Sequence, residues 1–189
     1  GTELLGLNAR QILDNGVGYV PEDRTVDGLV GGFSVAENLM LDRSDGEPFV
    51  KLGTLQTDAL NEFATEKLKS YDIRSQSIHE HVSKLSGGNQ QKVVLAREMS
   101  RELSLLVVSQ PTRGLDVGSI EFVHEQIVGV RDRGVPVIVV STELDEVVSL
   151  ADRIAVMYKG QIVGIVPADT PREKLGLMMA GERITEEAA

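Results

Sequence analysis

Short apolar stretches and longer helical patterns alternate in this chain. Runs that are rich in Val and Ile and bounded by turn residues are typical of strands buried on both faces of a parallel sheet. Four such runs occur: Val17–Val20, Leu103–Val108, Val135–Val140 and Ile154–Tyr158. Between the second and third runs, apolar residues recur at helical spacing at Ile120, Val123, Ile127 and Val130. This succession of strand, helix and strand predicts a βαβ unit and an α/β fold.

The fourth run leads into a predicted hairpin and a final helix. The turn dipeptide Lys159-Gly160 separates it from a second strand-like run at Gln161–Val166. Thr170-Pro171-Arg172-Glu173 then combines an N-cap residue, a proline suited to the first helical position and a capping-box glutamate. We therefore expect a helix to about Met179, followed by a frayed acidic tail over Glu182–Ala189.

The middle of the chain favours helices. Ser34-Val35-Ala36-Glu37 predicts a capping box at the start of a short helix, and Asp42–Gly53 is expected to form a polar loop. A longer helix follows, and Ser86 can cap a third helix that ends near Arg101. The stripe of the longer helix consists of Leu60, Phe63, Ala64, Lys67, Leu68 and Tyr71.

These patterns predict an α/β core that is interrupted by a helical subdomain. We assign the core to residues 1–32 and 102–168 and the helical subdomain to residues 33–101. Residues 169–189 are expected to form the C-terminal helix and the acidic tail.

The amino-acid composition excludes several kinds of partner and site. The formal net charge of −10 argues against a protein that binds a nucleic-acid backbone on its own. Cysteine is absent, which excludes disulfides, thiolate zinc sites and thiol catalysis from this chain. The sequence has no apolar run of about 18 residues that could cross a bilayer, and Gly1–Leu7 lacks a leader pattern. We expect a soluble, acidic protein of a reducing compartment.

The most informative segment is Leu85-Ser86-Gly87-Gly88-Asn89-Gln90-Gln91-Lys92. A serine cap followed by two glycines places unpaired backbone N–H groups and the positive end of a helix dipole where an anion can dock. Without side chains, Gly87 and Gly88 allow a phosphate to approach the backbone closely. The Ser-Gly-Gly triplet alone also fits an ordinary capped helix that begins after a glycine turn.

The whole octapeptide resembles the signature motif of ATP-binding cassette (ABC) ATPases, and three further segments resemble motifs of that family in the same order. The segment around Glu22 is similar to the Q-loop, with Glu22 at the position of the usual glutamine. Gln110–Asp116 resembles the end of the Walker B segment and the D-loop, whose aspartate is Asp116. Val139–Leu144 resembles the H-loop, with Thr142 in place of the histidine. The resemblance covers nearly the entire chain and implies a partial P-loop NTPase sheet core with an inserted helical signature subdomain.

The positions at which this chain departs from the family pattern are those that the family uses to hydrolyse ATP. The dipeptide Gly-Lys is absent, so no phosphate-cradling Walker A loop occurs, and the family layout places that loop before the start of this chain. The family's Mg²⁺-binding aspartate and water-polarising glutamate correspond to Ser109 and Gln110, and glutamine cannot act as a general base. Because Thr142 also replaces the histidine that senses the γ-phosphate, the resemblance implies that no catalytic residue is intact. The isolated chain is expected to be inactive.

The motifs that are kept act on a neighbouring molecule in this family. Two ABC cassettes face head to tail, so the resemblance implies that Ser86, Gly87, Gly88 and Asn89 meet the γ-phosphate of ATP held by a partner cassette, with Asp116 bridging the interface. ATP and Mg²⁺ are then cofactors of the full assembly. For the isolated chain we expect neither cofactor and no metal site.

Further segments resemble the C-terminal cassette of tandem importers for simple sugars and nucleosides. Pro21–Arg24, Asn89–Lys92, Gln110–Gly118 and Leu175–Gly181 together resemble the nucleoside branch more than the pentose or galactose branch. This resemblance implies a peripheral protein on the cytoplasmic face of a bacterial membrane. Its partners would be permease subunits and, indirectly, a solute-binding protein, but no nucleic acid. Phe33–Asn38 lies where family members contact the coupling helix of the permease, and a local hydrophobic staple accounts for the same residues.

Two other functions remain open at this point. A regulatory pseudo-ATPase cassette that binds no nucleotide would share the degenerate motifs, although the intact signature and Asp116 argue against it. A non-transport ABC protein of DNA repair or translation would need a basic surface or long coiled-coil arms, which this sequence lacks. His79 and His81 have the spacing of a metal pair but no third ligand in the sequence around them, so we interpret them as exposed loop residues.

Overall fold

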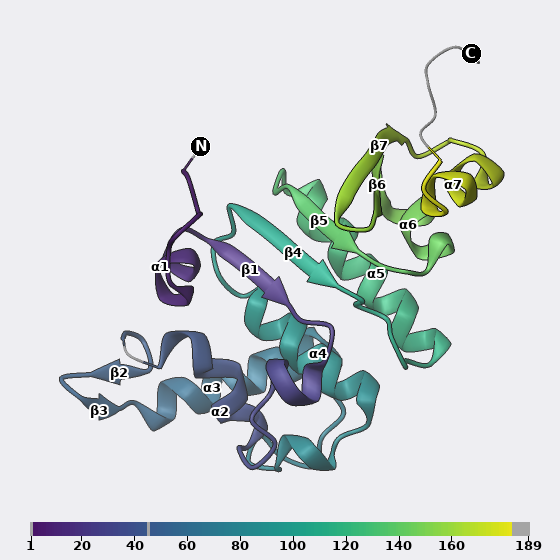
Figure 1. Ribbon diagram of the computed structural model, residues 1–189. Helices are drawn as coiled ribbons and strands as arrows, with labels where there is room; N and C mark the ends of the chain where they lie inside the picture. The colour runs from purple at the N-terminus through teal and green to yellow at the C-terminus, as the bar shows by residue number, and fades with distance from the viewer. Residues whose placement is uncertain (1, 45, 183–189) are drawn as a thin grey trace. The chain divides into compact units, whose positions relative to one another are not determined.

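The computed structural model describes residues 2–44 and 46–182, and it divides into two compact units, residues 1–140 and residues 141–189. The first unit runs from α1 to β5 and the second from α6 to α7 (Figure 1). Most of the predicted acidic tail, from residue 183 onward, lies outside the described residues.

A parallel three-stranded sheet forms the centre of the first unit. Its strands, in spatial order, are β1 (Val17–Val20), β4 (Leu105–Ser109) and β5 (Val137–Val140). Helix α5 (Val117–Asp132) connects β4 to β5, so the predicted βαβ unit and the α/β fold are confirmed. Both β4 and β5 begin two residues after their predicted starts. In β5 the reason is Pro136, which has no N–H to donate to the ladder.

One face of this sheet is buried and the other is partly open. Val20, Leu106 and Val108 are fully buried on the covered face, where helix α4 (Gly87–Glu98) packs against β1. The predicted apolar stripe of α5 is also buried over most of its length, at Val123, Ile127 and Val130. On the other face the side chains of Tyr19, Ile138 and Val140 are about half exposed.

The segment between β1 and β4 is mainly helical. It contains η1 (Arg24–Gly28), α2 (Val35–Met40), η2 (Leu41–Arg43), α3 (Thr57–Ser70), η3 (Val82–Lys84) and α4. The predicted capping box at α2 is confirmed, because Ser34 Oγ accepts the Glu37 N–H at 3.2 Å and Glu37 accepts the Ser34 N–H at 2.7 Å. Ser86 caps α4 as predicted, although the helix ends at Glu98 rather than near Arg101. The short helix α1 (Ala9–Asp14) before β1 has its own capping box, which the sequence interpretation missed.

The prediction of a polar loop over Asp42–Gly53 is wrong. Two short strands, β2 (Val50–Lys51) and β3 (Thr54–Leu55), form a hairpin there. Phe49 precedes the hairpin and is fully buried, with its ring centroid 5.0 Å from that of Phe63 in α3. The Arg43 guanidinium lies over both rings, 4.9 Å and 4.6 Å from their centroids. Phe49, packed against Phe63 of α3, therefore anchors the β2–β3 hairpin although the sequence around it is mostly polar.

The second unit is a small α/β assembly. It contains α6 (Leu144–Leu150), the antiparallel pair β6 (Arg153–Tyr158) and β7 (Gln161–Pro167), and α7 (Arg172–Met179). Ile154, Val156, Leu175 and Met178 form its core. The predicted hairpin and final helix are confirmed, but the predicted Thr170 cap is wrong. Pro171 occupies the N-cap position of α7, and no side chain caps the helix. Among the described residues, no helix combines the length and apolar character that a membrane span requires.

Phe49→Ala should lower the free energy of unfolding by about 3–5 kcal/mol, because a buried ring and its aromatic and cationic contacts are lost. Leu52→Gly, at the tip of the same hairpin, should not destabilise the chain. Leu52 is 98% exposed and holds a left-handed φ of 50°, which glycine adopts without strain. Urea unfolding followed by circular dichroism measures both changes. Equal losses in the two variants would contradict the anchoring role of Phe49.

Candidate functional site

Ser86–Asn89, called the signature turn from here on, forms the N-terminal end of α4. Ser86 has an extended backbone, and its Oγ accepts the Asn89 N–H at 3.4 Å and the Asn89 side-chain amide at 2.9 Å. Asn89 Oδ1 accepts the backbone N–H of Arg74 at 2.8 Å. Both ends of the Asn89 amide are thus bonded within the chain, whereas Ser86 is exposed with its hydroxyl oxygen acting as an acceptor. The Ser86 hydroxyl hydrogen and the first-turn N–H groups are the donors that this turn can offer to an anion.

Gly88 packs against the start of α5. A Cβ atom at Gly88 would overlap Ser119 Oγ and would lie 3.1 Å from Ser119 Cβ and 3.3 Å from Asp116 Oδ2. Asp116 caps α5, because its carboxylate accepts the Ser119 N–H at 3.0 Å and the Ser119 hydroxyl at 2.7 Å. Those two hydrogen bonds, the hydroxyl's first, hold the pKa of Asp116 below its usual range. The predicted signature and D-loop residues are therefore brought together in the first unit.

Neutral residues stand at the carboxyl end of β4, at the two positions that the motif resemblance aligns with carboxylates. Ser109 ends the strand, and Gln110 follows with a left-handed φ of 47° while its N–H donates to the Val140 carbonyl at 2.7 Å. Neither side chain can hold Mg²⁺ as a carboxylate does or take a proton from water. In the described parts of the chain, no cluster of three or more His, Cys, Asp or Glu side chains could hold a metal.

The other predicted site residues, Glu22 and Thr142, lie in different units. Glu22 follows β1 and forms an exposed ion pair with Arg113, which stands between β4 and α5. Thr142 is an exposed residue of the second unit, two positions before α6 begins at Leu144. The structure thus gathers the signature turn, Asp116 and the segment after β1 within the first unit.

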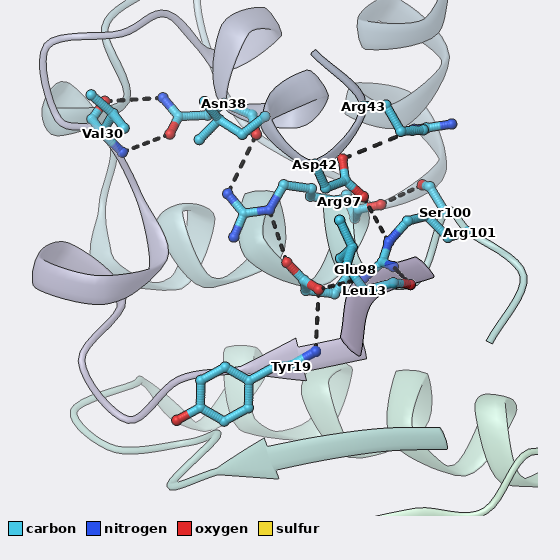
Figure 2. A network of polar contacts seen from close by, with 12 residues as sticks. Leu13, Tyr19, Val30, Asn38, Asp42, Arg43, Arg97, Glu98, Ser100 and Arg101 are labelled. Atoms are coloured by element: carbon cyan, nitrogen blue, oxygen red, sulfur yellow. Dashed lines mark hydrogen bonds and ion pairs between the residues drawn. The ribbon is translucent and has the colours of Figure 1, made fainter. Parts of the chain in front are cut away.

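A buried network of charged side chains, which the sequence interpretation missed, holds the other end of α4 (Figure 2). Glu98 lies at its centre, with Oε1 2.9 Å from Arg97 Nε and Oε2 3.0 Å from Arg101 Nη2. The same Oε2 accepts the backbone N–H of Tyr19 in β1 at 3.2 Å. One carboxylate therefore ties two arginines to a strand of the sheet.

Asp42, in η2, joins this network to the helical segment. Its Oδ2 lies 2.7 Å from Arg101 Nε, in an ion pair whose atoms are not aligned for a hydrogen bond. Burial raises the pKa of Asp42, and the charges of Arg101 and Arg43 oppose that rise. Arg97 Nη1 also reaches the backbone carbonyl of Asn38 in α2, at 3.5 Å. The sequence contains a signal for part of this network, since Arg97 and Glu98 directly follow the apolar run Val93–Ala96.

Comparison with known proteins adds to this geometry. A family model described as "ABC transporter" matches residues 1–113. The nucleoside import ATP-binding protein NupA of Lactococcus lactis is 48% identical over an alignment that covers 94% of this chain and 35% of the relative. The guanosine import ATP-binding protein NupO of Bacillus subtilis is 42% identical, with 96% of this chain and 36% of the relative covered.

This chain belongs to the ABC transporter family. A solved structure, the dimeric post-hydrolysis state of the ATP-binding cassette MJ0796 bound to ADP and Pi, matches with a TM-score of 0.67 and 20% identity. That match covers 86% of this chain and 68% of the solved one, and it shows the ABC ATPase fold alone. The chain spans about a third of the length of the curated ABC relatives.

Gly88→Ala should destabilise this ABC domain by about 1–3 kcal/mol, because the new methyl group would collide with Ser119. Gly129→Ala, inside α5, is the matched control. Its Cβ would lie 3.9 Å from the Arg133 guanidinium, so it should gain helix propensity without a clash. Ser119→Gly should restore most of the loss caused by Gly88→Ala. Chemical unfolding of Gly88→Ala, Gly129→Ala, Ser119→Gly and the Gly88→Ala/Ser119→Gly double variant checks this prediction, and similar stabilities of the two single alanine variants would refute it.

Proposed function

We propose that this chain is the second, signature-donating cassette of a tandem import ATP-binding protein for nucleosides. Relatives named for nucleoside and guanosine import share 48% and 42% of aligned residues with it. Relatives named for ribose import share 33–40%, and one named for glucose import shares 41%. The 48% identity favours nucleosides over simple sugars as the solute class, whereas the values of 42% and 41% do not separate the two classes.

The observation that carries the proposal is an intact signature turn in a chain whose β4 ends without a carboxylate. The exposed Ser86 hydroxyl and the unpaired first-turn N–H groups can donate to phosphate oxygens, and the helix dipole favours the negative charge. These donors fit the γ-phosphate of ATP held mainly by a partner cassette. Ser109 and Gln110 do not fit Mg²⁺, so we assign the metal and the attacking water to the partner's half of the site.

Asp116 and Val117 are suited to a contact with the partner cassette, because both are exposed. Asp116 is exposed and stays ionised, because hydrogen bonds from Ser119 lower its pKa. Val117 beside it is 82% exposed, an apolar side chain that a partner surface could cover. On this proposal the chain works on the cytoplasmic face of the membrane, with permease subunits as direct partners and a solute-binding protein as an indirect one. Phe33, two residues before α2, is 41% exposed, and on this proposal it contacts the permease.

Restoring the two carboxylates should not restore hydrolysis in this chain. Ser109→Asp with Gln110→Glu would offer ligands to Mg²⁺, but the sequence has no Gly-Lys loop to hold the β- and γ-phosphates in line. We expect phosphate release from Mg-ATP to equal a protein-free blank, and calorimetric titration to give a dissociation constant weaker than about 10 μM, since a helix N-terminus alone contributes about 0.3–1 kcal/mol. Steady turnover by the double variant would show a working site of its own.

Ser86 variants test the role in trans within the complete transporter. Aspartate and asparagine both cap helices as well as serine, so Ser86→Asp and Ser86→Asn should fold alike. Only Ser86→Asp places a charge near the partner-bound γ-phosphate, and like charges about 4 Å apart repel by about 4 kcal/mol at an effective dielectric of 20. We expect a roughly thousandfold lower ATPase rate for Ser86→Asp and a small change for Ser86→Asn.

Thr142→Ala is the internal control for that experiment. The family histidine is already absent at this position, so its ATPase rate should stay close to that of the unaltered transporter. If Ser86→Asp were harmless while Thr142→Ala abolished turnover, this cassette would own a hydrolytic site. If none of the three variants changed the ATPase rate, the chain would be a regulatory cassette that contacts no nucleotide.

A further inference from the structure

The side chain of Arg24 lies against the signature turn. Arg24 is the first residue of η1, the π-helical turn after β1, and its guanidinium rests over Gly87. A Cβ atom at Gly87 would lie 2.6 Å from Arg24 Nη2 and 3.5 Å from Cζ. Arg24 Nη1 donates to the backbone carbonyl of Arg113 at 3.1 Å. One side chain thus connects the segments that follow β1 and β4 with the first turn of α4.

The backbone of η1, which carries Arg24, is held at both of its ends. Asp23 caps η1, because its carboxylate accepts the Thr25 N–H at 2.9 Å. At the other end of η1, a Cβ atom at Gly28 would lie 3.2 Å from Val94 Cγ2, so the turn packs closely on α4. The position of the Arg24 backbone relative to α4 is therefore set by the cap at Asp23 and the close packing of Gly28 on Val94.

The stability of α4 does not explain this arrangement. A cation at a helix N-terminus is repelled by the helix dipole. Arg24 Nε is buried and has no hydrogen-bond partner among the described residues, which also costs free energy. What the guanidinium supplies is a planar group in close contact with Gly87, whose missing side chain leaves room for it.

We propose that Arg24 is a positioning residue that fixes the signature turn through its contact with Gly87. It couples movement of the segment after β1, which carries Glu22, to the direction of the Ser86 hydroxyl and the first-turn N–H groups. This inference rests on the proposed function, in which those donors meet the γ-phosphate of a partner's ATP.

A double-mutant cycle on the chain tests the contact. Gly87→Ala should displace the Arg24 guanidinium, with loss of its hydrogen bond to the Arg113 carbonyl, and so lower the folding equilibrium constant about fivefold. The cost should be much smaller when Arg24 is alanine. Gly32→Ala is the control, because its Cβ would meet nothing within 4 Å and its effect should not depend on Arg24. Urea unfolding gives all six constants. Additive effects of Gly87→Ala and Arg24→Ala would overturn the contact.

ATPase kinetics of the complete transporter test the coupling. Arg24→Ala should lower kcat about tenfold while the KM for ATP stays within about twofold, because the partner's loop holds the nucleotide and the signature turn acts in the closed state. Arg24→Lys should not restore kcat, since an ammonium group cannot lie flat over Gly87.

The outcomes separate this inference from the proposed function. Full rescue by Arg24→Lys, or normal kinetics of Arg24→Ala while Ser86→Asp is inactive, would overturn the positioning role and leave the proposed function standing. An unchanged ATPase rate in Ser86→Asp would overturn the proposed function itself.

Discussion

The buried ion network at the C-terminal end of α4 is the constraint on which the rest of the first unit depends. Each buried ion costs several kcal/mol in lost hydration, and that cost is offset only when its partners are correctly placed. Glu98 satisfies this condition by holding Arg97 and Arg101 while it accepts the Tyr19 N–H of β1. Asp42 adds the helical segment to the same set of contacts. We infer that the network contributes less to net stability than to selecting one position of α4 against both the sheet and α2.

This placement has consequences at the other end of the helix. The twelve residues of α4 span about 18 Å, and the helix is buried along nearly its whole length. A helix that is fixed at Glu98 and packed along its side presents its first turn in a defined direction. Gly88 completes the arrangement, because its contact with Ser119 leaves no room for a shift of the turn toward α5. On the proposed function, a movement of α2 is transmitted through the ion network to α4, and α4 carries it as a rigid helix to the signature turn.

Sequence patterns predicted those features whose causes are local. The strands, the capping box at Ser34 and the cap at Ser86 depend on residues within four positions of each other, so a single sequence contains their signal. The hairpin after η2 was missed because Phe49 finds its partner fourteen residues away, in Phe63. The ion network was missed for the same reason, since Glu98 and Tyr19 are 79 positions apart. At Thr170 the local rule itself failed, because the following proline took the cap position.

The two glycines of the signature turn have two possible physical explanations, ligand binding and packing within the chain. A phosphate-binding interpretation explains both glycines by close approach of a ligand. In the structure, Gly88 packs closely on Ser119 and Gly87 on the guanidinium of Arg24, so contacts within the chain offer a reason for each glycine that needs no ligand. The residue that packing does not explain is Ser86, whose capping role would be met equally by aspartate or asparagine. The serine hydroxyl places an acceptor and an uncharged donor on one small atom, whereas aspartate carries a charge and asparagine donates from a separate amide nitrogen; the hydroxyl is exposed at the positive end of α4. On the proposed function, Ser86 is therefore the residue that donates to the anion, and the two glycines position it.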